Sequence, residues 1–154
     1  MHRAMSTTVA FVLGAALAVA STSRSGEASA ASTDPGGTVI STATATQRVA
    51  PSGSARVHEL ARGANAFVGK LELDGGAAVP EHADLTEEYI VVLQGSGTLM
   101  LDGVAHPLAP GSAVFMPAGA TVSYANGPET MVAIQVFAGP ESADKYGAWP
   151  TVAR

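Results

Sequence analysis

The chain has 154 residues, of which 47% are hydrophobic and 14% are charged, and its net charge is −5. This length predicts one ordinary domain, and the hydrophobic content is sufficient for a buried core. The eight basic residues form no cluster, which argues against nucleic acid as a partner, because phosphate contacts require grouped Lys and Arg. The chain has no cysteine, so disulfides and a lipid-modified cysteine are excluded.

Residues 1–30 are typical of an export signal. Arg3 gives a positive start, residues 9–20 form an uncharged apolar run, and small residues ending at Ala20 or Ala30 provide cleavage sites. The run is shorter than the ~20 residues that a membrane span needs, and an uncleaved anchor is the alternative. We therefore expect export, to a periplasm or to the exterior, with no stable membrane span after cleavage. Residues 31–54, rich in Ser, Thr, Ala and Gly, are expected to form a flexible leader, in which residues 38–40 can add an edge strand.

From residue 55 onward, short β-prone runs alternate with turn signals. The expected strands are 55–60, 66–73, 89–93, 98–101, 105–108, 113–116, 121–125 and 131–137. Asp102-Gly103 is typical of a two-residue hairpin, and residues 95–97 are interpreted as a second hairpin. The pattern predicts an all-β barrel or sandwich over residues 55–139. In the tail, 140–154, one helical turn is expected, and Tyr146 and Trp149 are expected to pack over the barrel or against a partner subunit.

One short stretch combines a histidine with carboxylates. His82 and Asp84 lie two apart in an extended segment, so their side chains point to the same face. Residues 85–87 can turn the chain, and Glu88 then begins a strand whose next inward residue is Ile90. A mixed set of one imidazole and two carboxylates suits Mn, Fe, Ni or Zn. His58 and His106 lie outside this stretch and are interpreted as structural residues.

Each of these residues also has an interpretation without a metal. His82 can be a hydrogen-bonded residue at the rim, and Asp84 can cap the following turn through a backbone N–H. Glu88 is harder to explain in this way, because a carboxylate on an inward-facing position is costly unless it is paired. Without an ion, Asp84 and Glu88 would repel each other, and the pKa of one of them would be raised. The result would be an acid–base pair beside His82.

Two spaced motifs resemble those of the cupin superfamily. The first is carried by Gly76, His82, Asp84, Glu88 and Gly95, with Asp84 in place of a histidine, and the second by Gly111, Pro117, Gly119, Val122 and Asn126, with Val122 in place of a histidine. The resemblance covers residues 60–139 and implies a double-stranded β-helix, or jelly-roll, barrel. In the family three histidines and one glutamate hold a metal ion. The resemblance therefore implies either a reduced site of His82, Asp84 and Glu88 or no cofactor.

Together these features predict an exported small cupin barrel that binds a small molecule. The expected pocket residues are His82, Asp84, Glu88, Ile90, Val122 and Tyr124, the last two sharing one inward face. The alternative is an enzyme, either a metal-dependent dioxygenase or isomerase using His82, Asp84 and Glu88, or a metal-free acid–base catalyst, with Tyr124 as a further catalytic candidate. A third interpretation is a structural or partner-binding domain. The resemblance also implies a homodimer.

Overall fold

The computed structural model describes residues 37–152. The export signal expected at residues 1–30 and the first part of the expected leader lie outside the described residues. Within residues 37–152, no helix is long and apolar enough to cross a membrane.

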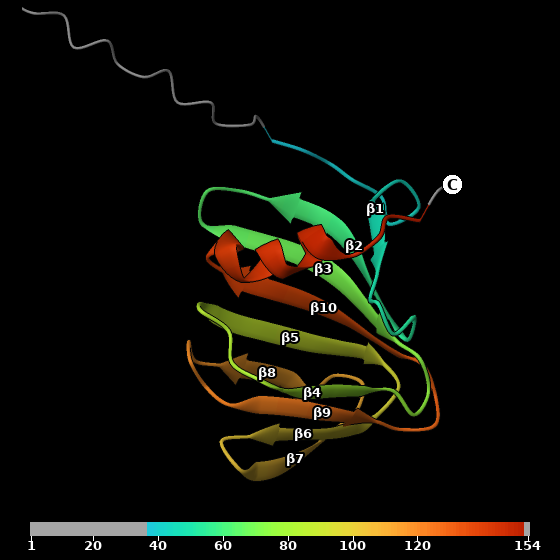
Figure 1. Ribbon diagram of the computed structural model, residues 1–154, viewed down its shortest axis with the longest axis vertical. Coiled ribbons are helices and arrows are strands. Elements are labelled where there is room, and N and C mark those ends of the chain that lie inside the picture. Colours follow the sequence, from blue (N-terminus) through green and yellow to red (C-terminus); the bar gives the residue numbers. More distant parts are fainter. Residues whose placement is uncertain (1–36, 153–154) are drawn as a thin grey trace, which may run out of the picture. The chain divides into compact units, whose positions relative to one another are not determined.

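The described residues form ten strands and one short helix, arranged as two antiparallel sheets (Figure 1). The elements are β1 (Thr46–Val49), β2 (Ala55–Arg62), β3 (Ala66–Leu73), β4 (Ala78–His82), β5 (Glu87–Gln94), β6 (Gly97–Leu101), β7 (Val104–Leu108), β8 (Ala113–Met116), β9 (Val122–Asn126), β10 (Met131–Ala138) and the 3₁₀ helix η1 (Pro140–Ala148). One sheet has the strand order β1-β2-β3-β10-β5-β8, and the other has the order β4-β9-β6-β7. The all-β prediction is confirmed, and the architecture is a β-sandwich.

The core lies between the two sheets because inward and outward residues alternate along the strands. In β3 and in β10 every second residue is buried, and Phe67 of β3 pairs with Phe137 of β10. Val122 and Tyr124 of the opposite sheet are also buried and belong to the same core cluster. Gln135 is the exception in this apolar series, since it is buried on the inward face of β10.

The strands expected from the sequence are present, with ends that differ by at most two residues, but two further strands were missed. Part of the expected leader forms β1, which pairs with β2, while residues 38–40 form no strand. β4, which ends at His82, pairs with β9 of the second motif. The missed strands are short, so their sequences carry little alternation.

The two expected hairpins have different outcomes. Leu101 pairs with Val104 across Asp102-Gly103, both of which have positive φ, so this hairpin is confirmed. The interpretation of residues 95–97 as a hairpin was wrong, because β5 and β6 belong to different sheets and this segment links them. Gly95 is required in the link, since its φ is 79° and a Cβ would lie 2.6 Å from the Thr130 carbonyl oxygen.

The C-terminal tail folds over the sandwich. η1 is longer than the single turn expected, and it buries Tyr146 against Phe67 and Phe137, with ring centroids 5.9 and 6.4 Å apart. The chain then runs back beside β1, where Thr151 forms a bridge with Arg48. The expectation that the tail packs over the barrel is therefore confirmed for Tyr146.

Candidate ligand-binding site

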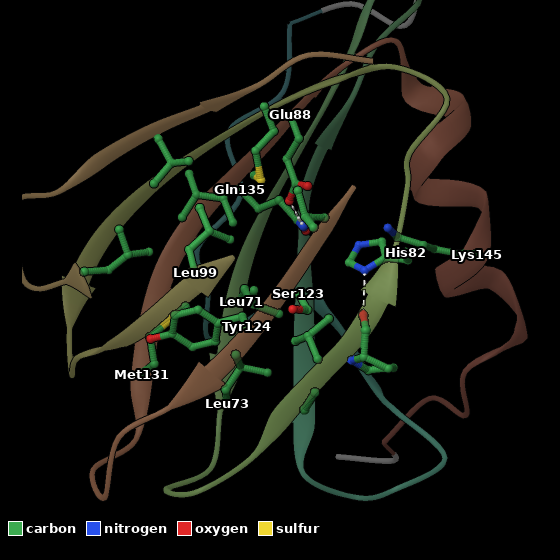
Figure 2. A pocket seen from close by; sticks show the side chains of 18 of the residues that line it. Leu71, Leu73, His82, Glu88, Leu99, Ser123, Tyr124, Met131, Gln135 and Lys145 are labelled. Atoms are coloured by element: carbon green, nitrogen blue, oxygen red, sulfur yellow. Dashed lines mark hydrogen bonds between the residues drawn. The ribbon is translucent and has the colours of Figure 1, made fainter. Parts of the chain in front are cut away.

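A cavity of about 290 Å³ lies between the two sheets (Figure 2). Its lining is mostly aliphatic and includes the predicted pocket residues His82, Glu88, Ile90, Val122 and Tyr124. Further apolar walls come from Leu71, Leu73, Leu99, Leu108, Val114, Met116 and Met131. Gln135, Lys145 and Tyr146 add polar atoms where η1 meets the barrel. Asp84 was also expected in the pocket, but it is not among the lining residues.

Glu88 is held inside the barrel by two successive hydrogen bonds, from Gln135 to Glu88 and from Tyr146 to Gln135. The residue is 5% exposed, and the Gln135 side-chain amide donates a hydrogen bond to Oε1 at 2.5 Å. The Tyr146 hydroxyl in turn donates to Gln135 Oε1 at 2.7 Å. Burial raises the pKa of Glu88 above its usual value, and the hydrogen bond from Gln135 only partly offsets this effect. Glu88 is thus a carboxyl group that favours its neutral form more than an exposed glutamate does.

Asp84 is bound by a lysine from the C-terminal helix. The Lys145 ammonium donates to both carboxylate oxygens, at 2.7 and 2.9 Å, and lies 4.8 Å from the centroid of the Phe137 ring. Burial works to raise the pKa of Asp84, but the bonds from His82 and Lys145 outweigh burial and lower it. The backbone carbonyl of Asp84 accepts a bond from the Gly119 N–H of the second motif, which fixes the position of this residue.

His82 ends β4 and faces both the cavity and Asp84. Its Nδ1 lies 2.9 Å from the Pro80 carbonyl oxygen, which can only accept, so this nitrogen carries a proton. Its Nε2 lies 3.5 Å from Asp84 Oδ2. The interaction with Asp84 raises the pKa of His82, against the opposing effect of burial. The interpretation of His82 as a hydrogen-bonded rim residue therefore agrees with the structure.

These residues do not fit the metal site that the resemblance implies. Among the described residues, no three His, Asp or Glu side chains form a group that could hold a metal ion. Lys145 engages Asp84, Gln135 engages Glu88, and the apolar Val122 stands at the position of the third histidine. The predicted metal set of His82, Asp84 and Glu88 is therefore not assembled in this arrangement.

Two other expectations about the carboxylates have clear outcomes. The expectation that one of Asp84 and Glu88 has a raised pKa is confirmed for Glu88, although burial is the main cause and Asp84 a minor one. The interpretation of Asp84 as a turn cap was wrong, because the Thr86 N–H donates to Ser142 Oγ instead. His58 and His106 lie in β2 and β7 and do not line the cavity.

Sequence reasoning missed Gln135, Lys145 and Tyr146 as site residues. Gln135 carries a usable signal, because it is the one polar residue at the inward positions of the 131–137 run. Lys145 carries no such signal, since it lies 61 positions after Asp84 in a tail without strong periodicity. Tyr146 was expected to pack, and its hydroxyl bond to Gln135 is the additional finding.

The fold and the cavity define a β-sandwich protein that encloses a cavity between its sheets. Residues 69–137 match the family model described as the cupin domain. Residues 69–137 belong to the cupin superfamily. No curated protein sequence matches it.

Solved structures show the same fold at low sequence identity. An RmlC-like cupin from Shewanella frigidimarina is 22% identical with a TM-score of 0.56, covering 61% of this chain and 84% of that one. The polyketide cyclase RemF from Streptomyces resistomycificus is 21% identical with a TM-score of 0.59, covering 66% and 78%. A predicted oxalate decarboxylase from Thermotoga maritima is 21% identical with a TM-score of 0.60, covering 66% and 99%. At these identities the likeness establishes the fold alone.

Proposed function

We propose that this protein binds a small, largely apolar organic molecule between its sheets. The observation that carries the proposal is the cavity of about 290 Å³, whose walls are mostly aliphatic and whose polar groups gather at one end. The volume is at the lower limit of ordinary ligand pockets, roughly 300–1,000 Å³. It is about twice the ~150 Å³ of an apolar cavity that accepts benzene. A molecule of about two fused rings matches this space.

The test uses a matched pair of substitutions on β5. Ile90→Phe adds volume at a cavity wall, whereas Val91→Phe adds the same ring on the opposite, exposed face of the strand. A ligand that binds only the folded state raises stability, by about 2.7 kcal/mol when its concentration is 100 times Kd. Apolar one- and two-ring compounds should therefore raise Tm for the unaltered protein and for Val91→Phe, but much less for Ile90→Phe. Equal shifts in both variants, or none in the unaltered protein, would contradict the proposal.

A second candidate is a metal-free acid–base catalyst. It is supported by Glu88, whose raised pKa and place at the cavity wall suit a group that moves a proton. The metal-dependent alternative has weaker support, because Asp84 and Glu88 are already engaged by Lys145 and Gln135. Conversion of a bound compound that is lost in Glu88→Gln, while its binding is retained, would favour the catalyst over the binding protein.

Export and dimerisation remain predictions. We propose export from the composition of residues 1–30, and the N-terminal residue of the protein recovered from its own cells tests this. A start at residue 21 or 31 is expected, and a start at Met1 in the cell interior would contradict export. Light scattering of the mature chain tests the homodimer.

A further inference from the structure

One oxygen of Glu88 remains available at the cavity wall. Within residues 37–152, Glu88 Oε1 accepts the bond from Gln135, and no bond is formed by Oε2. Among these residues, His58 Nδ1 is the one fully buried side-chain nitrogen or oxygen that lacks a hydrogen-bond partner. Because Glu88 Oε2 also lacks a partner, it is not fully buried. Since Glu88 lines the cavity, Oε2 is accessible from inside it. Figure 2 shows the Glu88 and Gln135 side chains projecting together into the space between the sheets.

The polar groups nearest to Glu88 already form hydrogen bonds, although the Lys145 ammonium keeps a third N–H. Both ends of the Gln135 amide are bonded, one to Glu88 and the other to Tyr146. The Lys145 ammonium is bonded to both oxygens of Asp84, and His82 Nδ1 is bonded to Pro80. A ligand that entered the cavity would therefore find Glu88 Oε2 uncommitted, beside groups whose own bonds keep them in place.

We propose that the ligand is a neutral, apolar molecule of about two-ring size with one hydroxyl group, and that this hydroxyl binds Glu88 Oε2. The inference rests on the proposed function, since it specifies the ligand of the same cavity. A hydroxyl is both a donor and an acceptor, so it pairs with Glu88 whether or not the carboxyl carries a proton. The remaining surface of the molecule would contact the aliphatic walls.

Other polar groups match the site less well. A ketone only accepts, so it cannot pair with an ionised carboxylate. A ligand carboxylate or a ligand ammonium would meet Lys145 and the carboxylates of Glu88 and Asp84 together, so neither sign of charge is clearly favoured there. Either ion would also lose far more solvation than a hydroxyl on entering apolar surroundings.

The experiment compares four probes that share one ring system: tetralin, 1-tetralol, 1-tetralone and 1-aminotetralin. Dissociation constants are measured by calorimetry at pH 7 on the full mature chain. We expect 1-tetralol to bind about tenfold more tightly than tetralin, which is the gain of one good hydrogen bond to a carboxyl group. It should also bind more tightly than the ketone and the amine.

Two variants identify Glu88 as the partner. Glu88→Leu removes the hydrogen-bonding group, so tetralin should still bind and the preference for 1-tetralol should disappear. Glu88→Gln keeps a hydrogen-bonding group of the same shape, so the preference should persist. Glu88→Leu also leaves the Gln135 amide without its acceptor, which lowers stability. The ranking of the four probes on the unaltered protein is therefore decisive by itself.

The outcomes separate this inference from the proposed function. If tetralin binds and 1-tetralol binds no more tightly, the hydroxyl inference is wrong and the apolar cavity proposal stands. If the amine or the ketone binds most tightly, or if the preference survives in Glu88→Leu, the inference is also wrong. If none of the four probes binds, both proposals fail.

Discussion

At the scale of single residues, the site consists of two carboxylates with opposite behaviour. Asp84 is held ionised from two directions, by the imidazole of His82 in β4 and by the ammonium of Lys145 in η1. Glu88 is bonded only by a neutral amide and is more deeply buried, so its pKa moves the other way. The same side-chain chemistry therefore gives a fixed ion pair at one position and a weak acid at the other.

Replacing Glu88 should change how stability depends on pH. The pKa of Glu88 is raised in the folded state, so its contribution to stability is fully present below about pH 4.5 and is lost as the pH rises through the folded pKa. The charge of Asp84 raises the pKa of Glu88, and the charges of Lys145 and His82 lower it. Relative to Glu88→Gln, the unaltered protein should lose unfolding free energy as the pH rises above 4.5. Urea titrations of both proteins at a series of pH values measure this, and a constant difference would contradict it.

Removing the lysine should leave Asp84 as an unpaired carboxylate. We expect Lys145→Met to cost about 1 to 2 kcal/mol of unfolding free energy. Loss of a fully buried ion pair would cost more, but solvent screens this lysine, which is 37% exposed. The control is Arg62→Met, which breaks an ion pair with Asp144 in which both side chains are more exposed, at 48% and 70%. Its cost should be below about 1 kcal/mol. Equal costs in urea unfolding would mean that the Lys145–Asp84 ion pair stabilises the protein no more than an exposed ion pair does.

At the scale of elements, η1 completes the site that the strands begin. Ser142 accepts the Thr86 N–H at the start of β5, Lys145 reaches Asp84, and Tyr146 reaches Gln135. A segment that follows the barrel in sequence thus supplies contacts to the first motif at two points and to β10 at a third. The helix itself is a 3₁₀ helix with little intrinsic stability, so these contacts and the burial of Tyr146 hold it.

Removing one hydroxyl tests how firmly η1 is coupled to Glu88. Tyr146→Phe leaves the buried oxygen of Gln135 without its donor, which should cost about 1 to 3 kcal/mol. Tyr89→Phe is the matched control, since it removes a hydroxyl that bonds Glu87 on the exposed face of β5. That change should stay within about 0.5 kcal/mol. Thermal and urea unfolding measure both losses of unfolding free energy. Similar losses would show that the buried hydrogen bond of Tyr146 stabilises the protein no more than the exposed one of Tyr89.

The link between the sheets offers a second test at this scale. Gly95 and Gly119 have the same φ of 79°, but a Cβ at Gly95 would meet the Thr130 carbonyl oxygen at 2.6 Å, and a Cβ at Gly119 would have no neighbour within 4 Å. Gly119→Ala should therefore cost only the backbone strain, about 1 to 2 kcal/mol. Gly95→Ala should cost distinctly more, and comparable Tm losses in the two variants would refute the steric account.

The sequence predicted the elements better than it predicted their partners. Alternation placed β3 and β8 to the residue, and the spacing of the two motifs indicated the superfamily. Alternation could not show that residues 95–97 cross between sheets, since a tight hairpin and a sheet-to-sheet link use the same glycines. β1 was missed because Thr46–Val49 is short and its pairing with β2 is visible only in the fold.

The sequence predicted strand residues that line the candidate site, but not which residues bind its carboxylates. Inward positions of strands can be inferred from period two, and this identified Glu88, Ile90, Val122 and Tyr124 at the cavity wall. The charge partners could not be inferred, because which cation reaches Asp84 depends on how the tail folds back. The motif that resembles a metal site thus identified both carboxylates, but it gave no indication that Lys145 contacts Asp84 or that Gln135 contacts Glu88.

At the scale of the whole molecule, the cavity depends on both sheets and on the tail together. Because Lys145 already neutralises the charge of Asp84, added divalent ions should bind only weakly at this carboxylate. We expect Mn, Ni and Zn salts, and equally a chelator, to leave the Tm of the untagged chain unchanged. A clear increase in Tm with one ion, abolished in His82→Ala, would show that the ion displaces the lysine.

The position of β10 has a consequence for how the chain acquires its structure. β10 is the strand that joins β3 to β5, yet it is the last strand to be synthesised. Until residues 131–138 are available, the two halves of the larger sheet have no shared neighbour, and their open edges are prone to intermolecular pairing. The larger sheet can therefore close only after residues 131–138 have been synthesised. For a chain exported as we propose, this would keep it unfolded during transport, and products truncated before β10 would be substrates for proteolysis.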